Sequence, residues 1–450
     1  MPEIATQHHQ ERLQLLTETL ESGALANVRQ MLHSLHPAEI AHLLESLPVY
    51  ERELVWSAIS SDHEGDVLTH VSDDVRSALI DEMDTQKLVA ATEGLATDDL
   101  ADILQQLPEA VIQEVLQSMD VQDRHRLETV MSYPEDTAGG LMNTDTVTVR
   151  SDVTLEVVMR YLRQRGELPD TTDKLIVVDR NDAYLGVLPL SDLLTQSPTK
   201  QVASVMKRDV QALPVNTPVS KITHLFEHRD LISAPVVDEH GKLLGRITID
   251  DVVDEIRDST EHSMLGMSGL DENEDMFAPV LVSARHRAVW LGLNLLTAFL
   301  ASWVIGLFET TIDKIVALAV LMPIVASMGG IAGSQTLTLV IRGMAVGQVG
   351  FANASHVFTK ELGVGFINGV LWAIVVAAIT WLWFDPQIGM IIAAAIIINM
   401  VIAAVAGVMI PLLLKKFGAD PALGGSVMLT TVTDVIGFMA FLGLATLVLL

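Results

Sequence analysis

The sequence predicts a multidomain membrane protein in which a soluble half precedes five helical membrane spans. Short helical segments fill residues 5–132, and strand and helix patterns then alternate twice up to residue 256. Apolar segments long enough to cross a bilayer follow at 288–308, 315–341, 362–384, 388–413 and 424–450. We expect an α-helical superhelical N-terminal domain (1–132), tandem α/β domains (133–200 and 201–256), a linker or plug helix (257–284) and an all-α five-span transmembrane domain (285–450).

The charge of the chain is confined to its soluble half. Half of the residues are hydrophobic, yet the formal net charge is −29. From Arg287 onward six basic residues balance six acidic ones, so the other 22 basic and 51 acidic residues all precede it. This excess of carboxylate repels nucleic acid and suits hard cations, which take oxygen ligands. We therefore expect no nucleic-acid partner.

Several classes of chemistry lack their residues. The chain has no cysteine, which excludes thiolate metal sites and a cysteine nucleophile. The spans hold one deep aspartate and neither an H-E-x-x-H helix nor a serine–histidine pair, so we expect no intramembrane hydrolase and no enzyme. The first 30 residues are polar and helical in pattern, so we expect no signal peptide there.

An internal repeat indicates that the first domain is a stack of short helices. The pattern of residues 36–48 recurs at 95–108, with apolar positions at i, i+4 and i+7 and a closing Leu-Pro. Such repeats are typical of superhelical arrays. In the second copy Asp98, Asp99 and Asp102 crowd the start of a helix. They either complement the helix dipole on a solvated face or hold a divalent cation shared with another domain.

The two α/β modules share one order of elements. In each, a β run ending in Val-Val-Asp, at Asp179 and at Asp238, turns back through a glycine-containing loop, and the next strand leads into an acidic helix start. This order resembles a tandem pair of CBS domains. Such pairs commonly sense ligands and some bind adenosine nucleotides. No residue here identifies a nucleotide, so ATP is expected from the resemblance alone. The acidic connector over 252–276 is either a solvated linker or the lever between sensor and membrane.

The second apolar segment contains residues that disfavour a helix. Pro323 and the glycines after it predict an interruption at membrane depth, where non-helical backbone is tolerated if it lines protein or water. Gly329 and Gly330 are therefore candidate pore-lining residues, with close helix packing as the alternative. In the third segment, Gly365 and Gly369 form a GxxxG pattern that indicates helix packing or a dimer contact.

Basic residues indicate the orientation in the membrane. Under the positive-inside rule, the side richer in Lys and Arg is cytoplasmic. Only Lys314 falls on the opposite side from the other basic residues around the spans, which are Arg285, Arg287, Arg342, Lys360, Lys415 and Lys416. We expect a multi-pass protein of a bacterial-type cytoplasmic (inner) membrane, with the N-terminus in the cytoplasm and the C-terminus outside.

One charge lies in the last apolar segment. A carboxylate there, that of Asp434, costs roughly 2.5–3.5 kcal/mol at the bilayer centre unless it faces water, a cation or a partner. Thr430 lies one helical turn before it and Gly437 one turn after, which gives a small, oxygen-rich stripe. Asp434 is either a helix-packing carboxylate or a cation site on a conduction path. We favour the cation site, with Ser426 as a further pore-lining candidate.

Together these features resemble the MgtE family of magnesium channels over nearly the whole chain. The similar stretches are residues 138–142, 360–365, 420–422 and 433–437. The resemblance implies a homodimer with a pore along its two-fold axis, where Asp434 of each subunit holds a largely hydrated Mg²⁺. It also implies that intracellular Mg²⁺ closes the channel by bridging domains. The matching regulatory positions are Asp66, Asp98, Asp102, Asp230, Asp251 and Asp254.

The chain departs from the family pattern near the expected pore. An asparagine that usually follows the paired glycines is Ile331 here, and another near the start of the last span is replaced around Ser426. Pro218 and Ser220 stand where relatives can carry acidic ligands in the second CBS domain. The preferred hypothesis is that the protein is a channel that imports Mg²⁺. The rivals are a carrier of Co²⁺ or a broader set of divalent cations, and a membrane-tethered Mg²⁺ sensor.

Overall fold

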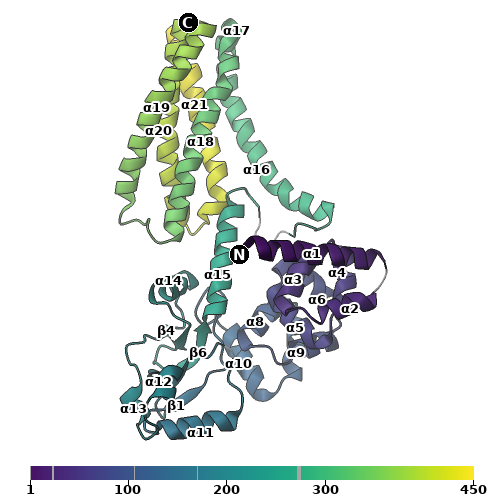
Figure 1. Ribbon diagram of the computed structural model, residues 1–450. Coiled ribbons are helices and arrows are strands. Elements are labelled where there is room, and N and C mark those ends of the chain that lie inside the picture. The colour runs from purple at the N-terminus through teal and green to yellow at the C-terminus, as the bar shows by residue number, and fades with distance from the viewer. Residues whose placement is uncertain (1, 23–24, 106, 170, 271–274) are drawn as a thin grey trace. The chain divides into compact units, whose positions relative to one another are not determined.

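The computed structural model describes residues 2–22, 25–105, 107–169, 171–270 and 275–450, which divide into two compact units (Figure 1). One unit comprises Met1–Asp258 with Asp275–Ala278, and the other comprises Ser259–Glu274 with Pro279–Leu450. Residues 271–274 of the expected acidic connector lie outside the described residues. The first unit contains the helical and CBS-like parts of the chain, and the second contains the apolar helices.

Helices α1 (Pro2–Glu21) and α2 (Leu25–Leu32) precede four helix pairs. The pairs are α3 (Pro37–Glu45) with α4 (Val49–Trp56), α5 (Ser61–His70) with α6 (Asp73–Asp81), α7 (Thr85–Thr92) with α8 (Thr97–Gln105), and α9 (Glu109–Ser118) with α10 (Val121–Met131). Their first helices start 24 residues apart and contact one another in order. The predicted helical repeat is present, but the similarity of 36–48 to 95–108 matches a first helix to a second one and misses this period.

Buried arginines close the turns of the first two helix pairs in the same way. Arg52 donates to the carbonyls of Leu44 and Leu47, at 3.0 and 3.1 Å, and so closes the turn between α3 and α4. One repeat later, Arg76 makes the same two bonds to the carbonyls eight and five residues before it. Arg52 is 2 % exposed and also forms an ion pair with Asp275 at 2.8 Å. Each guanidinium thus bonds to carbonyls at a helix end and in the turn that follows it.

The next part is two copies of one α/β module. Strands β1 (Thr148–Arg150), β2 (Lys174–Val178) and β3 (Tyr184–Pro189) form one sheet, and β4 (Leu213–Pro214), β5 (Ser233–Val237) and β6 (Leu243–Thr248) form the other. In both, the first pairing is parallel, the second is antiparallel, and the register shifts at the last residue pair of the middle strand. The helices are α11 (Leu155–Arg165), α12 (Leu190–Thr195), α13 (Val202–Val205) and α14 (Val219–Arg229).

Helix α15 (Ile249–Gly266) begins directly after β6 and contributes residues to both units. The second unit then contains α16 (Val280–Gly306), the short α17 (Glu309–Lys314), α18 (Ala317–Ala345), α19 (Ala354–Trp383), α20 (Pro386–Lys416) and α21 (Pro421–Leu449). Five of these helices are long and apolar enough to span a membrane, as the sequence predicts. Helix α20 packs against α18, α19 and α21 and supplies much of the buried interior of this unit.

The predicted interruption of the second span is wrong, because α18 runs without a break through Pro323 and both glycines. Close packing accounts for Gly329 but not for Gly330. A Cβ added at Gly329 would lie 2.2 Å from Asn399 Nδ2 of α20, whereas one at Gly330 would have no neighbour within 4 Å. In α19, a Cβ at Gly365 would lie 2.8 Å from that of Ala404. The GxxxG pattern therefore packs α19 against α20 within the chain.

Candidate cation sites

Six aspartates from two helix starts make up what we call the acidic cluster. They are Asp98, Asp99 and Asp102 on α8 and Asp250, Asp251 and Asp254 on α15. Acidic residues stabilise the first turn of a helix through the helix dipole, which accounts for each half of the cluster separately. Electrostatic repulsion acts between the halves, from Asp250 on Asp98 and Asp99 and from Asp98 on Asp251. The fold thus brings together carboxylates that are some 150 residues apart in the chain.

Asn143 holds the α8 half of the cluster in place. Its amide Nδ2 donates to Asp98 Oδ1 at 3.1 Å, and its own Oδ1 accepts the backbone N–H of Asp145 at 2.7 Å. The backbone of Asn143 exchanges two 2.8 Å hydrogen bonds with that of Arg246 in β6. Asp98 is only 7 % exposed. Asn143 therefore connects the helical repeat to both CBS-like modules, to the first through its amide and to the second through its backbone.

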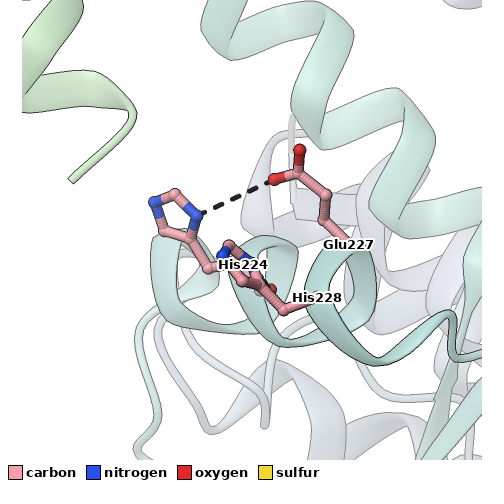
Figure 2. A group of neighbouring side chains, drawn as sticks. All are labelled: His224, Glu227 and His228. Atoms are coloured by element: carbon pink, nitrogen blue, oxygen red, sulfur yellow. Dashed lines mark hydrogen bonds and ion pairs between the residues drawn. The ribbon is translucent and has the colours of Figure 1, made fainter. Parts of the chain in front are cut away.

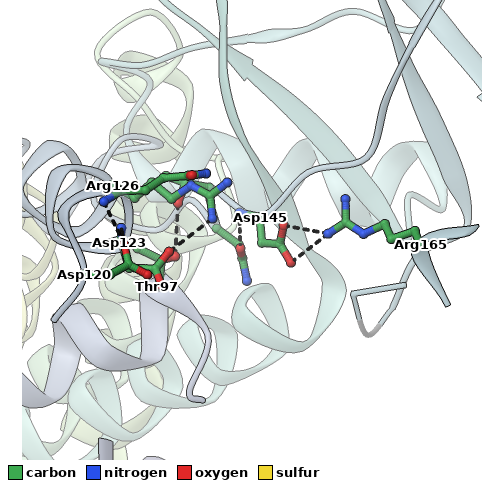
Figure 3. Close-up of polar contacts among 9 residues, drawn as sticks. Thr97, Asp120, Asp123, Arg126, Asp145 and Arg165 are labelled. Carbon is green, nitrogen blue, oxygen red and sulfur yellow. Dashed lines mark hydrogen bonds and ion pairs between the residues drawn. The ribbon is translucent and has the colours of Figure 1, made fainter. Parts of the chain in front are cut away.

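Two further contacts lie beside this amide. The hydroxyls of Thr97 and Thr144 are 3.0 Å apart, next to Asp98 and Asn143 in the chain. Asp145 accepts a hydrogen bond from Arg165 Nη2 at 3.0 Å, as Figure 3 shows. The start of α8 is thereby held against the entry segment of the first module by direct polar contacts.

The α15 half is held by the end of β6. Thr248 donates to Asp251 Oδ2 through both its hydroxyl, at 2.9 Å, and its backbone N–H, at 3.3 Å. Asp250 Oδ2 accepts from the hydroxyl of Thr171 at 3.3 Å. These bonds orient two carboxylates at the first turn of α15 without neutralising either.

Burial and mutual repulsion make the cluster costly when it is fully ionised. Burial first, and then nearby carboxylates, raise the pKa of Asp98 to about 6 and that of Asp251 to about 8. Burial likewise raises the pKa of Asp99 and of Asp102 to about 7, with Arg76 opposing the rise for Asp102. Near neutral pH the cluster therefore gains from either protons or a divalent cation, and oxygen-only ligands suit Mg²⁺.

The remaining two predicted regulatory residues lie apart from this core. Burial lowers the pKa of His70, and the charges of Asp254 and Asp66 oppose that shift, which places Asp66 at the margin of the cluster. Asp230 is exposed and ends α14 in the left-handed conformation, at φ 49°. No hydrogen bond or ion pair in the described ranges joins Asp230 to the cluster. The sequence did not point to Asn143 or Asp250, and it pointed to Asp99 only as part of the acidic helix start that either complements the helix dipole or holds a divalent cation.

Asp434 differs from the aspartates of the acidic cluster in both burial and hydrogen bonding. It is partly exposed on α21, and no donor or cation among the residues described by the structure contacts it. The hydroxyls of Thr430, Thr431 and Thr433 donate within their own helix, at 2.7 to 3.1 Å. Their oxygens consequently offer only lone pairs to anything else. Ser426 is partly exposed two turns before Asp434, and its carbonyl accepts the Thr430 hydroxyl. This stripe can attract a hydrated cation and has nothing to offer an anion.

An exposed face of α18 mixes polar and apolar side chains, and on it the Thr338 hydroxyl donates to Met267 Sδ at 3.7 Å. A cavity of about 690 Å³ opens there, lined by Gly330, Ile331, Ser334, Gln335, Thr338 and Leu339. Ile331 is 58 % exposed on this face, and Gly329 is buried against Asn399. Hydroxyl and amide groups on the outside of a membrane helix are costly in lipid, so this face calls for water or protein against it.

Two buried polar residues of the membrane helices escaped the sequence reasoning. Glu361 is 4 % exposed, accepts from the Thr336 hydroxyl at 3.1 Å and pairs with Lys360 at 2.9 Å. Asn399 is fully buried and donates to the carbonyl of Val325 at 2.9 Å. Polar residues inside apolar segments are the signal that could have found both. They connect α18 to α19 and α20.

The end of α15 is anchored on the membrane helices. His262 Nε2 contacts Asp420 Oδ2, and the other oxygen of Asp420 caps α21 by accepting from Ala422 N at 2.8 Å. Met267 packs against a hydrophobic cluster that includes Leu337 and Leu429. Helix α15, which begins at the acidic cluster, thus contacts the start of α21 near its own end. Helix α21 carries Asp434.

Comparisons with known proteins agree with this organisation. Family models match the MgtE intracellular N domain at residues 35–136, the CBS domain at 138–198 and 202–258, and the MgtE divalent cation transporter at 322–444. A magnesium transporter MgtE of Thermus thermophilus is 30 % identical over 441 residues, covering 96 % of this chain and 98 % of the relative. Another from Bacillus subtilis is 26 % identical over 430 residues, covering 95 % of each chain.

One solved structure resembles the soluble half. It is the cytosolic domain of the Mg²⁺ channel MgtE in complex with ATP, with 32 % sequence identity and a TM-score of 0.50. The match covers 53 % of this chain and 98 % of that one. The similarity in both sequence and fold therefore extends over nearly the whole of that cytosolic domain.

Proposed function

Because the chain belongs to the MgtE family of magnesium transporters, we propose that it is a homodimeric channel that imports Mg²⁺ and is closed by intracellular Mg²⁺ at the acidic cluster. It is a multi-pass membrane protein with five candidate spans. We place the soluble half in the cytoplasm and the C-terminus outside, since basic residues cluster on the soluble side. We propose the domain boundaries that the sequence predicts, which follow residues 132, 200, 256 and 284.

The observation that carries the proposal is the unpartnered carboxylate of Asp434 on a membrane-spanning helix. A charge at such depth is retained where it faces water or an ion pathway. Mg²⁺ gives up its water reluctantly, so one carboxylate per subunit, beside threonine lone pairs, suits a hydrated ion. Weak binding of this kind also lets the ion leave, which conduction requires.

In the proposed homodimer, the exposed face of α18 meets the second subunit or the water of the pore. Gln335 and Ser334 line an open cavity on one chain, where a second copy or pore water can satisfy them. Ser426 and Gly330 are the remaining proposed pore-lining residues. Gly329 has no side chain, and the position that a Cβ would take is filled by Asn399. Gly329 can therefore contribute only through its backbone.

The acidic cluster supplies the closing mechanism. Without a divalent cation, ionised aspartates of α8 and α15 repel one another, and Mg²⁺ removes the repulsion between the two helices. Asp98, Asp102, Asp251 and Asp254 are the proposed core ligands, with Asp66 at the margin and Asp230 as a separate ligand. Since α15 ends against α21, a change at its first turn can be transmitted along one helix toward Asp434.

ATP is the proposed nucleotide ligand of the CBS-like modules. The support is the solved relative with ATP bound, whose sequence is 32 % identical to this chain. The test is direct binding of ATP to the full-length protein with and without Mg²⁺.

Transport is tested with the purified protein in liposomes loaded with a Mg²⁺-sensitive dye. We expect Mg²⁺ entry that excess external Ca²⁺ does not inhibit, and weak inhibition by Co²⁺. Equal flux of Co²⁺ and Mg²⁺ would favour the broader divalent transporter, and no flux in either direction would favour a membrane-tethered sensor.

A further inference from the structure

We propose that His224, Glu227 and His228 on α14 bind a borderline divalent metal such as Zn²⁺, Co²⁺ or Ni²⁺. One potential ligand atom from each residue lies within 4.8 Å of the other two, and Figure 2 shows the three side chains gathered on the helix. In the part of the chain that the structure describes, this is the one group of His, Asp and Glu side chains so placed. It lies outside the acidic cluster and the Asp434 stripe.

The helical spacing creates the arrangement. Residues at i, i+3 and i+4 share one face of an α-helix, so two imidazoles and a carboxylate project from adjacent turns. His224 Nδ1 is 3.9 Å from Glu227 Oε2, and the two imidazole ring centres are 5.9 Å apart. Tetrahedral zinc with bonds of about 2.0–2.1 Å holds its ligand atoms about 3.4 Å apart. Side-chain rotations that bring these atoms closer by up to about 1.4 Å close that difference.

One of the imidazoles is already oriented as metal-ligating histidines are. His228 Nδ1 lies 2.8 Å from the carbonyl oxygen of His224. With the proton on Nδ1 donated to that carbonyl, Nε2 keeps its lone pair for a metal. Metal-bound histidines generally use the second ring nitrogen in this way, which fixes the tautomer and the ring orientation.

Packing does not require these three residues. The buried face of α14 is formed by Val219, Ile222 and Phe226, and the helix is ended by Asp230. Glu227 and His228 are exposed, and His224 is partly exposed. Side chains at a helix surface can therefore move to a metal at little cost to the core. A fourth coordination position stays open to water.

The ligand types select a different metal from the one proposed for the acidic cluster. Imidazole nitrogen is a good ligand for zinc, nickel and cobalt, whereas Mg²⁺ prefers oxygen and keeps several waters. Two imidazoles and one carboxylate form the kind of three-residue set that leaves one position open on zinc. The second CBS-like module would thus prefer a different metal from the Mg²⁺ that the oxygen-only acidic cluster suits.

The test is equilibrium dialysis of the full-length protein against Zn²⁺ in excess Mg²⁺, which keeps the oxygen sites filled. Wild type is compared with His224→Gln, His228→Gln and the control His125→Gln. His125 is a matched control because it is exposed on α10 with Glu128 at i+3, but Thr129 replaces the second histidine at i+4. Titration with Co²⁺ adds a spectroscopic readout, because histidine ligands give bound Co²⁺ visible absorption bands.

We expect one Zn²⁺ per chain for wild type and for His125→Gln. Each α14 variant should bind at least about tenfold more weakly and lose the Co²⁺ bands, while Mg²⁺ transport continues. If His224→Gln and His228→Gln retain Zn²⁺ as wild type does, the metal lies elsewhere and the proposal is overturned. Absence of Zn²⁺ binding in wild type would overturn it equally, and neither result bears on Mg²⁺ flux.

Discussion

The acidic cluster and Asp434 show two ways in which one chain uses carboxylates. The cluster crowds six aspartates, buries Asp98 to 7 % exposure and fixes it with Asn143. Asp434 stands alone, partly exposed, with no donor among the described residues. In the proposed scheme, crowding would make a bound cation part of what holds the two helices together, which suits regulation. Isolation would leave a cation weakly held, which suits passage. The predictions below test this contrast, from the largest expected effect to the smallest.

The largest effect belongs to Asp434. Asp434→Asn keeps the shape of the side chain but removes the charge that attracts the cation, so Mg²⁺ flux should fall to the leak of protein-free liposomes. Asp313→Asn, which removes an exposed carboxylate on α17, should transport as wild type. Wild-type flux in Asp434→Asn would remove this residue from the conduction path.

Neutralising the cluster should abolish the increase in the free energy of unfolding that Mg²⁺ gives the soluble unit. Saturating Mg²⁺ at about 100 times its dissociation constant adds about 2.7 kcal/mol to the free energy of unfolding of a protein that binds it only when folded. Asp98→Asn with Asp251→Asn should lose this gain, and should be more stable than wild type in EDTA because the repulsion is gone. Thermal unfolding with and without Mg²⁺ measures both effects.

Asp230→Asn is the comparison variant for the cluster, since Asp230 is proposed as a separate ligand, is exposed and lies apart from those six aspartates. It should lose at most a minor part of the stabilisation that wild type gains from Mg²⁺. If Asp230→Asn loses that gain and the double variant keeps it, the proposed closing site has been placed on the wrong carboxylates.

The stability of the protein in EDTA should depend on pH, because the aspartates of the cluster titrate differently in the folded and unfolded states. An unfolded aspartate titrates near 3.8, whereas the pKa values in the folded protein are about 6 for Asp98 and about 8 for Asp251. The folded state therefore binds more protons, and its stability in EDTA should fall as the pH rises from about 4 to about 8. The gain from added Mg²⁺ should grow over the same range. A stability in EDTA that rises between pH 5 and 8 would contradict the buried, repelling cluster.

A buried carboxylate with partners should behave differently from Asp434. Glu361→Ala leaves the Thr336 hydroxyl without its acceptor, at a cost of about 1–3 kcal/mol. We expect a lower melting temperature, with flux per folded protein unchanged. Lys360→Gln removes only the exposed side of the ion pair and should cost less than about 1 kcal/mol. Loss of flux in folded Glu361→Ala would assign Glu361 to the pathway.

The sequence predicted the architecture because its signals are local. Five apolar segments predicted five spans, and the repeated strand, turn and helix predicted two similar modules. The interruption of α18 was predicted wrongly because Pro and Gly are weak helix formers in isolation. Packing of Gly329 around Asn399 overrides that preference in the folded protein.

The sites were predicted less completely, because long-range contacts build them. Asp98 and Asp251 could be named through the family resemblance, but nothing local in the sequence links Asn143 to Asp98, or His262 to Asp420. The period of the helical repeat was missed for a related reason. Its clearest markers are Arg52 and Arg76, whose bonds to helix-end carbonyls become evident only in the fold.

The most direct test of the gating scheme is Mg²⁺ flux measured against Mg²⁺ on the side of the soluble half. Wild type should close as that concentration rises, and Asp98→Asn with Asp251→Asn should stay open. The same measurement on Asp230→Asn separates the cluster from acidic residues elsewhere. If the double variant closes at the concentration that closes wild type, the acidic cluster is a structural feature and the gate lies elsewhere.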